Sequence, residues 1–508
     1  MKRVTRALIG AAMLMVGTAA NAEWRRFETQ HFIIYSESND KRVDELATGL
    51  EKIDGLMRMA TGLPMDGEAV KVRIYEMANE QEVQAALGQS NSGVAGFYTS
   101  NILGPYAVTL RRLVAETDYQ FTPELVLHHE YAHHFMLQYF PATYPGWYIE
   151  GFAELIGSSK TLPDGKIAYG YPAKQRGHEI GAEWVDMREI LLNPPEKTRY
   201  DAYGQGWAMT HYLTFSKERA PQLRRYLGAL TAGKNAAEAA SAFGDLGTLN
   251  REAHSYVLGG RFDYKPVPVT VQTPVVQKVS AVPAAEAALI PETIAFSDFS
   301  LSEVRKADDR AREEKRRATV LAHVRSKVAQ FPNDPFALTL LAQFENAAGN
   351  TAQAEAAADR VLAIQPSNVG AMVVKSMLLS DAAAGLSGSA RAKEAEQARA
   401  LAVAANKADP DNPLTYVAFY KTYPAAGARA PADAVNALET AVEKLPSNEN
   451  VRLLLVNELT VENRYAEAMF VLSPIANDPH DSPMRQAARD RMAQLKAKAA
   501  ASQTAAKS

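Results

Sequence analysis

The fold of this chain is organised around one run of seven residues, His128-His129-Glu130-Tyr131-Ala132-His133-His134. Only one register of the run has the spacing His-Glu-x-x-His, and it consists of His129, Glu130 and His133. Residues four apart lie on the same face of a helix, so both imidazoles can reach one metal ion. Glu130 is rotated by about 100° from His129, which brings its carboxylate beside the ion as a candidate general base.

The residues on either side predict that this run lies inside a single helix. Thr122-Pro123-Glu124 offers an N-cap, a proline at the first helical position and an acid in the first turn. No helix breaker follows until Pro141. His128 and His134 point away from the ligand face, so we expect them to be packed or solvated side chains.

A second pattern follows at Pro145-Gly146-Trp147-Tyr148-Ile149-Glu150-Gly151-Phe152-Ala153-Glu154, where we expect another helix. His-Glu-x-x-His followed by Trp-x-x-Glu-Gly-Phe-Ala-Glu resembles the gluzincin metallopeptidases, the group that includes thermolysin and aminopeptidase N. The resemblance implies that Glu150 is the third ligand of a Zn²⁺ ion, and that Glu154 orients a ligand histidine. It covers about residues 23–261, with a slightly shorter gap between the motifs than in the members of the group.

The resemblance also implies an α+β, zincin-like fold with a strand-rich first lobe. Residues 31–35 and 70–75 have the apolar patterns of strands, and residues 93–112 predict a hairpin that turns at Gly104-Pro105. In the family, an edge strand beside the zinc holds extended substrate by backbone pairing, and this hairpin is the candidate. It lacks the Gly-x-Met-Glu-Asn signature of aminopeptidases, so we expect an endopeptidase.

The family stabilises the oxyanion of the reaction with a Tyr or His that lies further along the chain. Tyr203 and His211 lie at a suitable remove here. We prefer Tyr203, because it stands at the start of a helix predicted at residues 203–216.

The first residues predict an export signal. Lys2, Arg3 and Arg6 precede an apolar run over residues 7–17, and Ala20-Asn21-Ala22 has the small residues of a cleavage site. As a helix this run would be about 16 Å long, too short for a bilayer core of about 30 Å. We therefore expect a periplasmic or secreted protein without a transmembrane segment after cleavage.

Composition narrows the possible functions. The chain has 508 residues, 47% of them hydrophobic, which is typical of a globular protein with several domains. Its net charge of −3 provides no general basic surface, so we expect no nucleic-acid partner. Cysteine is absent, which excludes disulfides, thiolate metal sites and cysteine nucleophiles.

The C-terminal part repeats. A proline next to Asn or Asp recurs at intervals of 34, 44, 36 and 33 residues, at Pro332, Pro366, Pro410, Pro446 and Pro479. A period near 34 with a turn proline resembles tetratricopeptide repeats, and Leu341, Ala342 and Ala354 fall at that family's small-residue positions. Such helix pairs stack into an array with a concave groove, which implies a peptide or protein partner.

We therefore expect an α+β zincin-like metallopeptidase domain followed by an all-α, tetratricopeptide-like solenoid. Between them, a Pro/Val-rich segment predicts an extended linker from which one or two strands lie on a neighbour. The expected boundaries are a signal peptide at 1–22, the metallopeptidase domain at 23–262 (a strand-rich lobe at 23–115 and a helical lobe at 116–262), the linker at 263–300, the repeats at 301–495 and a disordered tail at 496–508.

The expected function is hydrolysis of peptide bonds by an exported zinc enzyme with Glu130 as general base, and with repeats that recruit substrate or partner. The alternative is a periplasmic scaffold in which the repeats bind proteins and the metallopeptidase-like domain is inactive. The presence of Glu130 favours the enzyme, because an inactive domain has no chemical need for a base between two ligands. Zinc-dependent hydrolysis of another kind of bond stays open.

Overall fold

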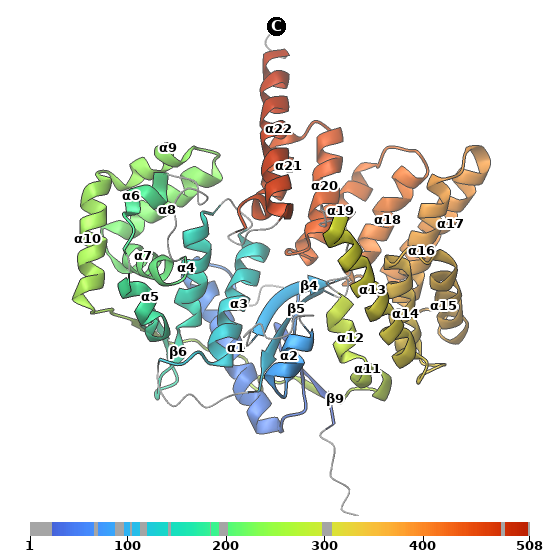
Figure 1. The fold of residues 1–508 in the computed structure, drawn as a ribbon, viewed down its shortest axis with the longest axis horizontal. Coiled ribbons are helices and arrows are strands. Elements are labelled where there is room, and N and C mark those ends of the chain that lie inside the picture. Colours follow the sequence, from blue (N-terminus) through green and yellow to red (C-terminus); the bar gives the residue numbers. More distant parts are fainter. Residues whose placement is uncertain are drawn as a thin grey trace, which may run out of the picture.

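A computed structural model describes residues 23–65, 70–86, 96–101, 104–111, 119–140, 144–182, 184–192, 202–296, 307–478 and 483–505. The expected signal peptide at 1–22 lies outside the described residues. An α/β part, which includes strand β4 (Gly96–Asn101), lies beside an array of helices, as Figure 1 shows. Among the helices that are described, none combines the length and the apolar character needed to cross a bilayer.

A six-stranded sheet forms the centre of the α/β part, with the strand order β4-β5-β3-β2-β1-β9. The other strands are β1 (Arg25–Glu28), β2 (Phe32–Ser36), β3 (Val72–Met77), β5 (Gly104–Leu110) and β9 (Lys278–Ala281). β2, β3 and β5 run parallel to one another, and the remaining pairs are antiparallel. The strands predicted at 31–35 and 70–75 are confirmed, and so is the hairpin, in which β4 pairs with β5.

Side chains of the sheet alternate between two hydrophobic cores. Phe32 and Ile34 of β2 point to one face, where α1 (Asp40–Thr61) and α3 (Pro123–Tyr139) cover them. Ile33 and Tyr35 point to the other face and pack with α2 (Glu80–Ala86) and α12 (Ile290–Ala295). Because both faces are covered, β2 is apolar at nearly every position instead of at every second one.

The helical lobe of the α/β part follows the sheet. Its longer helices are α3, α4 (Gly146–Gly157), α7 (Gly204–Phe215), α8 (Arg219–Thr231) and α10 (Leu246–Gly259). Shorter helices are α5 (Gly177–Ala182), α6 (Met187–Leu192) and α9 (Ala236–Ala240), and β6 (Lys160–Thr161) and β7 (Ile167–Tyr169) belong to a small second sheet. α4 and α7 cross closely at Gly151 and Gly206: a Cβ on Gly151 would lie 2.2 Å from the Gly206 carbonyl oxygen.

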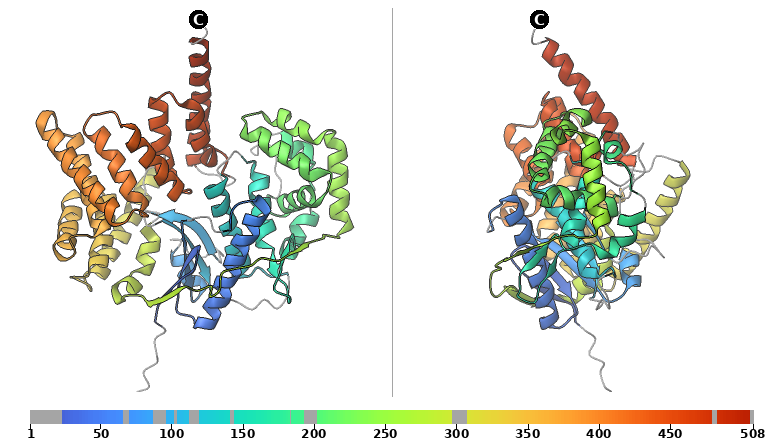
Figure 2. Two further views of the ribbon diagram at one scale, coloured as in Figure 1. Left: turned by 180° about the vertical axis from the view of Figure 1, so that it is seen from behind. Right: turned by 90° about the vertical axis from the view of Figure 1, so that its left-hand side faces the viewer.

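The segment predicted as a linker at 263–300 is packed against the α/β part over its described residues, which end at 296. Its two strands confirm the prediction: β8 (Lys265–Val267) pairs with β7, and β9 pairs with β1. Both strands lie at sheet edges, where prolines are tolerated because no backbone donor is needed on the outer side. We call residues 263–296 the strap. Figure 2 shows the strap crossing the back of the α/β part.

The end of the strap forms two short helices that the sequence did not predict, α11 (Ala284–Ala288) and α12. Ile290 and Ile294 pack into the core on the outer face of the sheet. Leu289 and Phe296 pack instead into the core of the first repeats. The two helices therefore form a wedge, residues 284–296, that joins the sheet to the repeats as one packed unit.

The repeat region is an array of helices in which each helix packs on the next. They are α13 (Ala307–Val328), α14 (Pro335–Ala347), α15 (Thr351–Ile364), α16 (Val369–Ala384), α17 (Gly388–Ala408), α18 (Pro413–Ala425), α19 (Ala432–Lys444), α20 (Glu449–Val461), α21 (Tyr465–Ala476) and α22 (Pro483–Ala505).

The structure explains the recurring proline with its Asn or Asp. The N-caps of α14, α16, α18 and α20 are Asp334, Asn368, Asn412 and Asn448, and each side chain accepts a hydrogen bond from a backbone amide of the first turn. The turn residues thus mark the start of every second helix, which confirms the predicted helical repeats.

The disordered tail predicted at 496–508 is wrong for residues 496–505, which continue α22. This stretch is rich in alanine and contains no glycine or proline, so its low complexity is compatible with a helix. Residues 506–508 lie outside the described residues.

The shared wedge predicts that the two parts of the chain unfold together. Leu289 is fully buried among the repeats, so Leu289→Ala should lower the free energy of unfolding by about 2–4 kcal/mol. Calorimetry should show that the sheet and the repeats unfold in one transition, and that the Tm of this transition is lower in the variant. Val279→Ala on the strap is the control. Val279 is 50% exposed, so this change should lower the free energy of unfolding by less than about 0.5 kcal/mol. Two separate transitions, of which only one shifts, would contradict the shared core.

Candidate metal centre

Helices α3 and α4 pack side by side and bring three predicted ligands together. His129 and His133 come from α3 and Glu150 comes from α4. The Nε2 atoms of the two histidines are 3.1 Å apart. Oε2 of Glu150 lies 3.4 Å from Nε2 of His129 and 3.6 Å from Nε2 of His133. These three atoms form a nearly equilateral triangle.

The triangle has the size that a tetrahedral zinc ion requires. Zinc binds imidazole nitrogen and carboxylate oxygen at about 2.0–2.2 Å, so two ligands of a tetrahedron are about 3.3–3.6 Å apart. The three separations agree with that spacing to within about 0.2 Å. Two imidazoles and one carboxylate are also the donors of a catalytic zinc site with its fourth position open. The residues present therefore fit zinc, and their role as ligands stays a prediction.

The charges of the cluster depend on one another. Glu150 is only 1% exposed, and although burial would raise its pKa, the facing His133 and His129 hold that pKa well below its usual range. Burial likewise opposes the charge of His129, but the carboxylates of Glu150 and Glu154 outweigh it and raise the pKa of His129 to about 10. At neutral pH the metal-free cluster therefore contains a charged imidazole between carboxylates.

Glu154 lies where the resemblance placed an orienting acid. Its Oε1 is 3.1 Å from Nδ1 of His129, on the opposite side of the ring from Glu150. Arg176 donates a hydrogen bond of 2.8 Å to the same oxygen and is also paired with Glu179. Glu154 thus aims Nε2 of His129 at the other two donors. Arg176 was missed by sequence reasoning, because no motif or spacing connects it with the cluster.

Of the two candidates for the oxyanion, the structure brings Tyr203 to the cluster and leaves His211 apart. The Tyr203 ring lies 6.1 Å from the His129 ring and packs against the guanidinium of Arg176. Burial raises the pKa of Tyr203 to about 12, so its hydroxyl stays protonated and can donate a hydrogen bond. His211 is fully buried elsewhere: its Nε2 donates to the carbonyl of Gly170, and its Nδ1 accepts from Tyr256.

Glu130 lies between the two histidines on α3 and is half-buried. Its carboxylate is near enough to His129 and Tyr203 to add to the raised pKa of each. It therefore belongs to the same cluster of charges without being one of the three donors. This arrangement matches the position expected of a general base.

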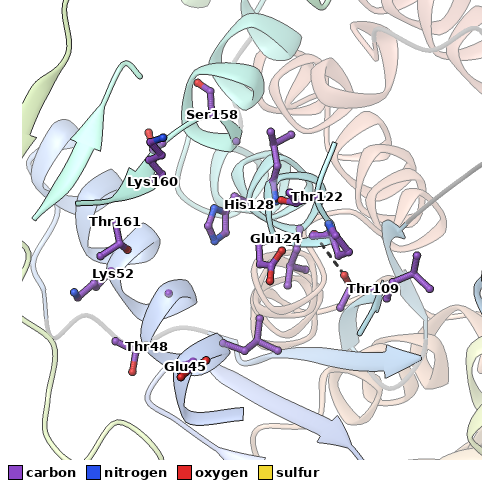
Figure 3. A pocket seen from close by; sticks show the side chains of 18 of the residues that line it. Glu45, Thr48, Lys52, Thr109, Thr122, Glu124, His128, Ser158, Lys160 and Thr161 are labelled. Carbon is purple, nitrogen blue, oxygen red and sulfur yellow. Dashed lines mark hydrogen bonds between the residues drawn. The ribbon is translucent and has the colours of Figure 1, made fainter. Parts of the chain in front are cut away.

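The two outer histidines lie off the triad, as predicted. His128 faces a separate cavity of about 720 Å³, together with Glu124 at the start of α3 and Lys52 of α1 (Figure 3). His134 points toward the sheet, where its Nδ1 is 2.7 Å from the hydroxyl of Tyr98 on β4. Burial lowers the pKa of both imidazoles, to about 4 for His128 and about 3 for His134. Both rings are therefore neutral at pH 7.

Comparison with known proteins found similarity among solved structures. No protein-family model matches the chain, and no curated protein matches it either. Among solved structures, the chain is similar to a tetratricopeptide-repeat protein of Thermus thermophilus at 22% identity, over 36% of this chain and 91% of that one, with a TM-score of 0.31. That score is too low to define a fold, so the description of the repeats rests on the helices themselves.

The pKa of His129 predicts that zinc binding releases a proton. The histidine must be neutral to bind a metal, and it is protonated in the metal-free protein up to about pH 10. Affinity should therefore rise about tenfold per pH unit near neutrality, with about one proton released per ion. Calorimetry in two buffers of different ionisation enthalpy measures that proton count. His128→Gln, one residue away and off the triad, should leave it unchanged, and release of no proton by the wild type would contradict the prediction.

The contact between Glu154 and His129 predicts a loss of metal affinity when the carboxylate is removed. Glu154→Gln should weaken zinc binding by about 10–100-fold, as is usual when the partner of a ligand histidine is lost. Competition with a fluorescent chelator measures the affinity. Glu179→Gln is the matched control, because Glu179 also pairs with Arg176 but is not among the donors near His129. An equal loss in both variants would show that Glu154 has no specific role.

Proposed function

We propose that this chain is a zinc-dependent peptidase in which His129, His133 and Glu150 hold the ion. The observation that carries the proposal is the triangle of donors, 3.1, 3.4 and 3.6 Å on its sides, next to the carboxylate of Glu130. Buried charged groups of this kind are paired with one another or coordinate a metal ion. Bound zinc would polarise the scissile carbonyl and acidify a water molecule.

The side chains around the ion have separate roles in this proposal. Glu130 accepts a proton from the attacking water and passes it to the nitrogen of the leaving amine. Tyr203, which is protonated at neutral pH, donates a hydrogen bond to the oxygen that becomes negative during the reaction. Glu154 holds the ring of His129, and Arg176 holds Glu154.

The rest of the chain supports a polypeptide as substrate. β4 is the last strand of its sheet and packs beside α3, so an extended chain could pair with its outer edge close to the donors. The repeats offer a surface for a protein partner or for a second part of the substrate. The export signal makes the periplasm or the exterior of the cell the proposed location.

A second candidate function is that of a scaffold. The array of helices from α13 to α22 favours it, because stacked helix pairs are a common platform for binding proteins. In that case the cluster of His129, His133 and Glu150 would have a structural role or none, and the repeats alone would bind the partner. The two functions differ in a single property, metal-dependent hydrolysis.

Replacing the general base should separate chemistry from metal binding. Glu130→Gln should lower the rate of casein hydrolysis by about 10²–10⁴-fold, because the water loses its proton acceptor, while one zinc ion stays bound. Elemental analysis and a hydrolysis assay with and without a chelator measure the two properties. Glu124→Gln makes the same change six residues earlier on α3, and this variant should keep both the bound zinc and the rate of hydrolysis. A wild-type protein that binds zinc and hydrolyses nothing would favour the scaffold.

A further inference from the structure

One tripeptide occurs twice in the repeats with two different environments. Pro366-Ser367-Asn368 precedes α16, and Pro446-Ser447-Asn448 precedes α20. In both turns the asparagine caps the helix: Asn368 accepts from the amide of Ala371 and Asn448 accepts from the amide of Val451. Neither cap uses the serine side chain. A contact that Ser447 makes and Ser367 does not is therefore unrelated to capping.

The two turns differ in burial. Pro366 and Ser367 are exposed, whereas Pro446 is buried and Ser447 is half-buried. The second turn is covered because it docks on the α/β part: Oγ of Ser447 lies 3.0 Å from the hydroxyl of Tyr98 on β4. The same hydroxyl is 2.7 Å from Nδ1 of His134 on α3. A hydrogen-bonded series therefore runs from the repeats through the edge strand to the helix of the metal cluster.

A buried arginine holds the second turn rigid. Arg452 is 3% exposed, and it donates to the carbonyl of Pro446 at 2.6 Å and to that of Val471 at 3.2 Å. Within the described residues no carboxylate is paired with it, and burial lowers its pKa to about 10. A buried cation without a counter-charge is costly, so this clamp on the turn is not explained by stability alone.

The docked turn stands at the junction of β4 and α3. Tyr98 is on the terminal strand of the sheet, whose outer side has no strand partner in the part of the chain that the structure describes. Figure 1 shows helices α20 to α22 beside α3, close to β4. A polypeptide paired with the outer edge of β4 would therefore meet residues 446–448. The wedge at 284–296 packs with α13 to α16 of the first repeats.

We propose that residues 446–448 form an internal latch: docked on Tyr98, they close the edge of β4 to an extended polypeptide, and movement of α19 to α21 away from β4 opens it. The inference deepens the proposed peptidase function and rests on it for its catalytic consequence. The latch itself is a property of the contact between Ser447, Tyr98 and His134, and it can be tested without activity.

The test uses the full chain with zinc, and compares Ser447→Ala with Ser367→Ala, the same change in the matching turn. Ser447→Ala removes the hydrogen bond to Tyr98, so amide exchange over residues 96–101 should become about three- to tenfold faster. Casein hydrolysis should rise by a similar factor with unchanged zinc affinity. Ser447→Glu adds a charge at the contact with Tyr98. It should increase both amide exchange and hydrolysis more than Ser447→Ala does. Ser367→Ala should match the wild type.

The latch would be overturned if amide exchange in β4 had the same rate in both Ser447 variants as in Ser367→Ala. Faster exchange with slower hydrolysis would also overturn it, because the contact would then support the site instead of closing it. If exchange becomes faster and neither wild type nor variants hydrolyse casein, the latch stands and the proposed peptidase function fails. If hydrolysis depends on zinc but exchange in β4 does not change, the proposed function stands and the latch fails.

Discussion

The buried carboxylate of Glu150 between two imidazoles is the constraint on which the α/β part depends. A carboxylate that is 1% exposed is tolerable only with positive charge or hydrogen-bond donors beside it, and the ring of His129 supplies that charge. The contact requires α3 and α4 to lie in a fixed register. The close crossing of α4 with α7 at Gly151, the acid Glu154 and its partner Arg176 all hold this register in place.

Local patterns carried most of the correct predictions. The cap at Thr122 and the spacing of the histidines predicted α3 and the helix face shared by His129 and His133, and the turn at Gly104-Pro105 predicted the hairpin. The features that were missed depend on contacts between distant parts of the chain. Arg176 meets Glu154 across 22 residues, and Ser447 meets Tyr98 across 349. A periodic pattern has no information about such partners, since Arg176 lies in a short 3-10 helix and Ser447 in a turn.

The strap shows how composition can mislead. Residues 263–296 are rich in proline and valine, a composition typical of a flexible spacer, yet their valines pack on the first core and their last two helices enter two cores at once. The first repeats therefore lie against the α/β part in one defined position. The sheet and the first repeats are therefore mechanically connected through this wedge.

The proton that His129 carries in the metal-free cluster has a consequence for how the protein matures. Many small zinc domains cannot fold until the ion arrives, because their ligands repel one another or stay solvated. Here the charged ring of His129 already faces Glu150 and Glu154, so the packing of α3 on α4 includes a compensating positive charge without a metal ion. Under the proposed function, folding of the polypeptide and loading of the ion are then two successive events, and the supply of metal sets how many molecules become competent.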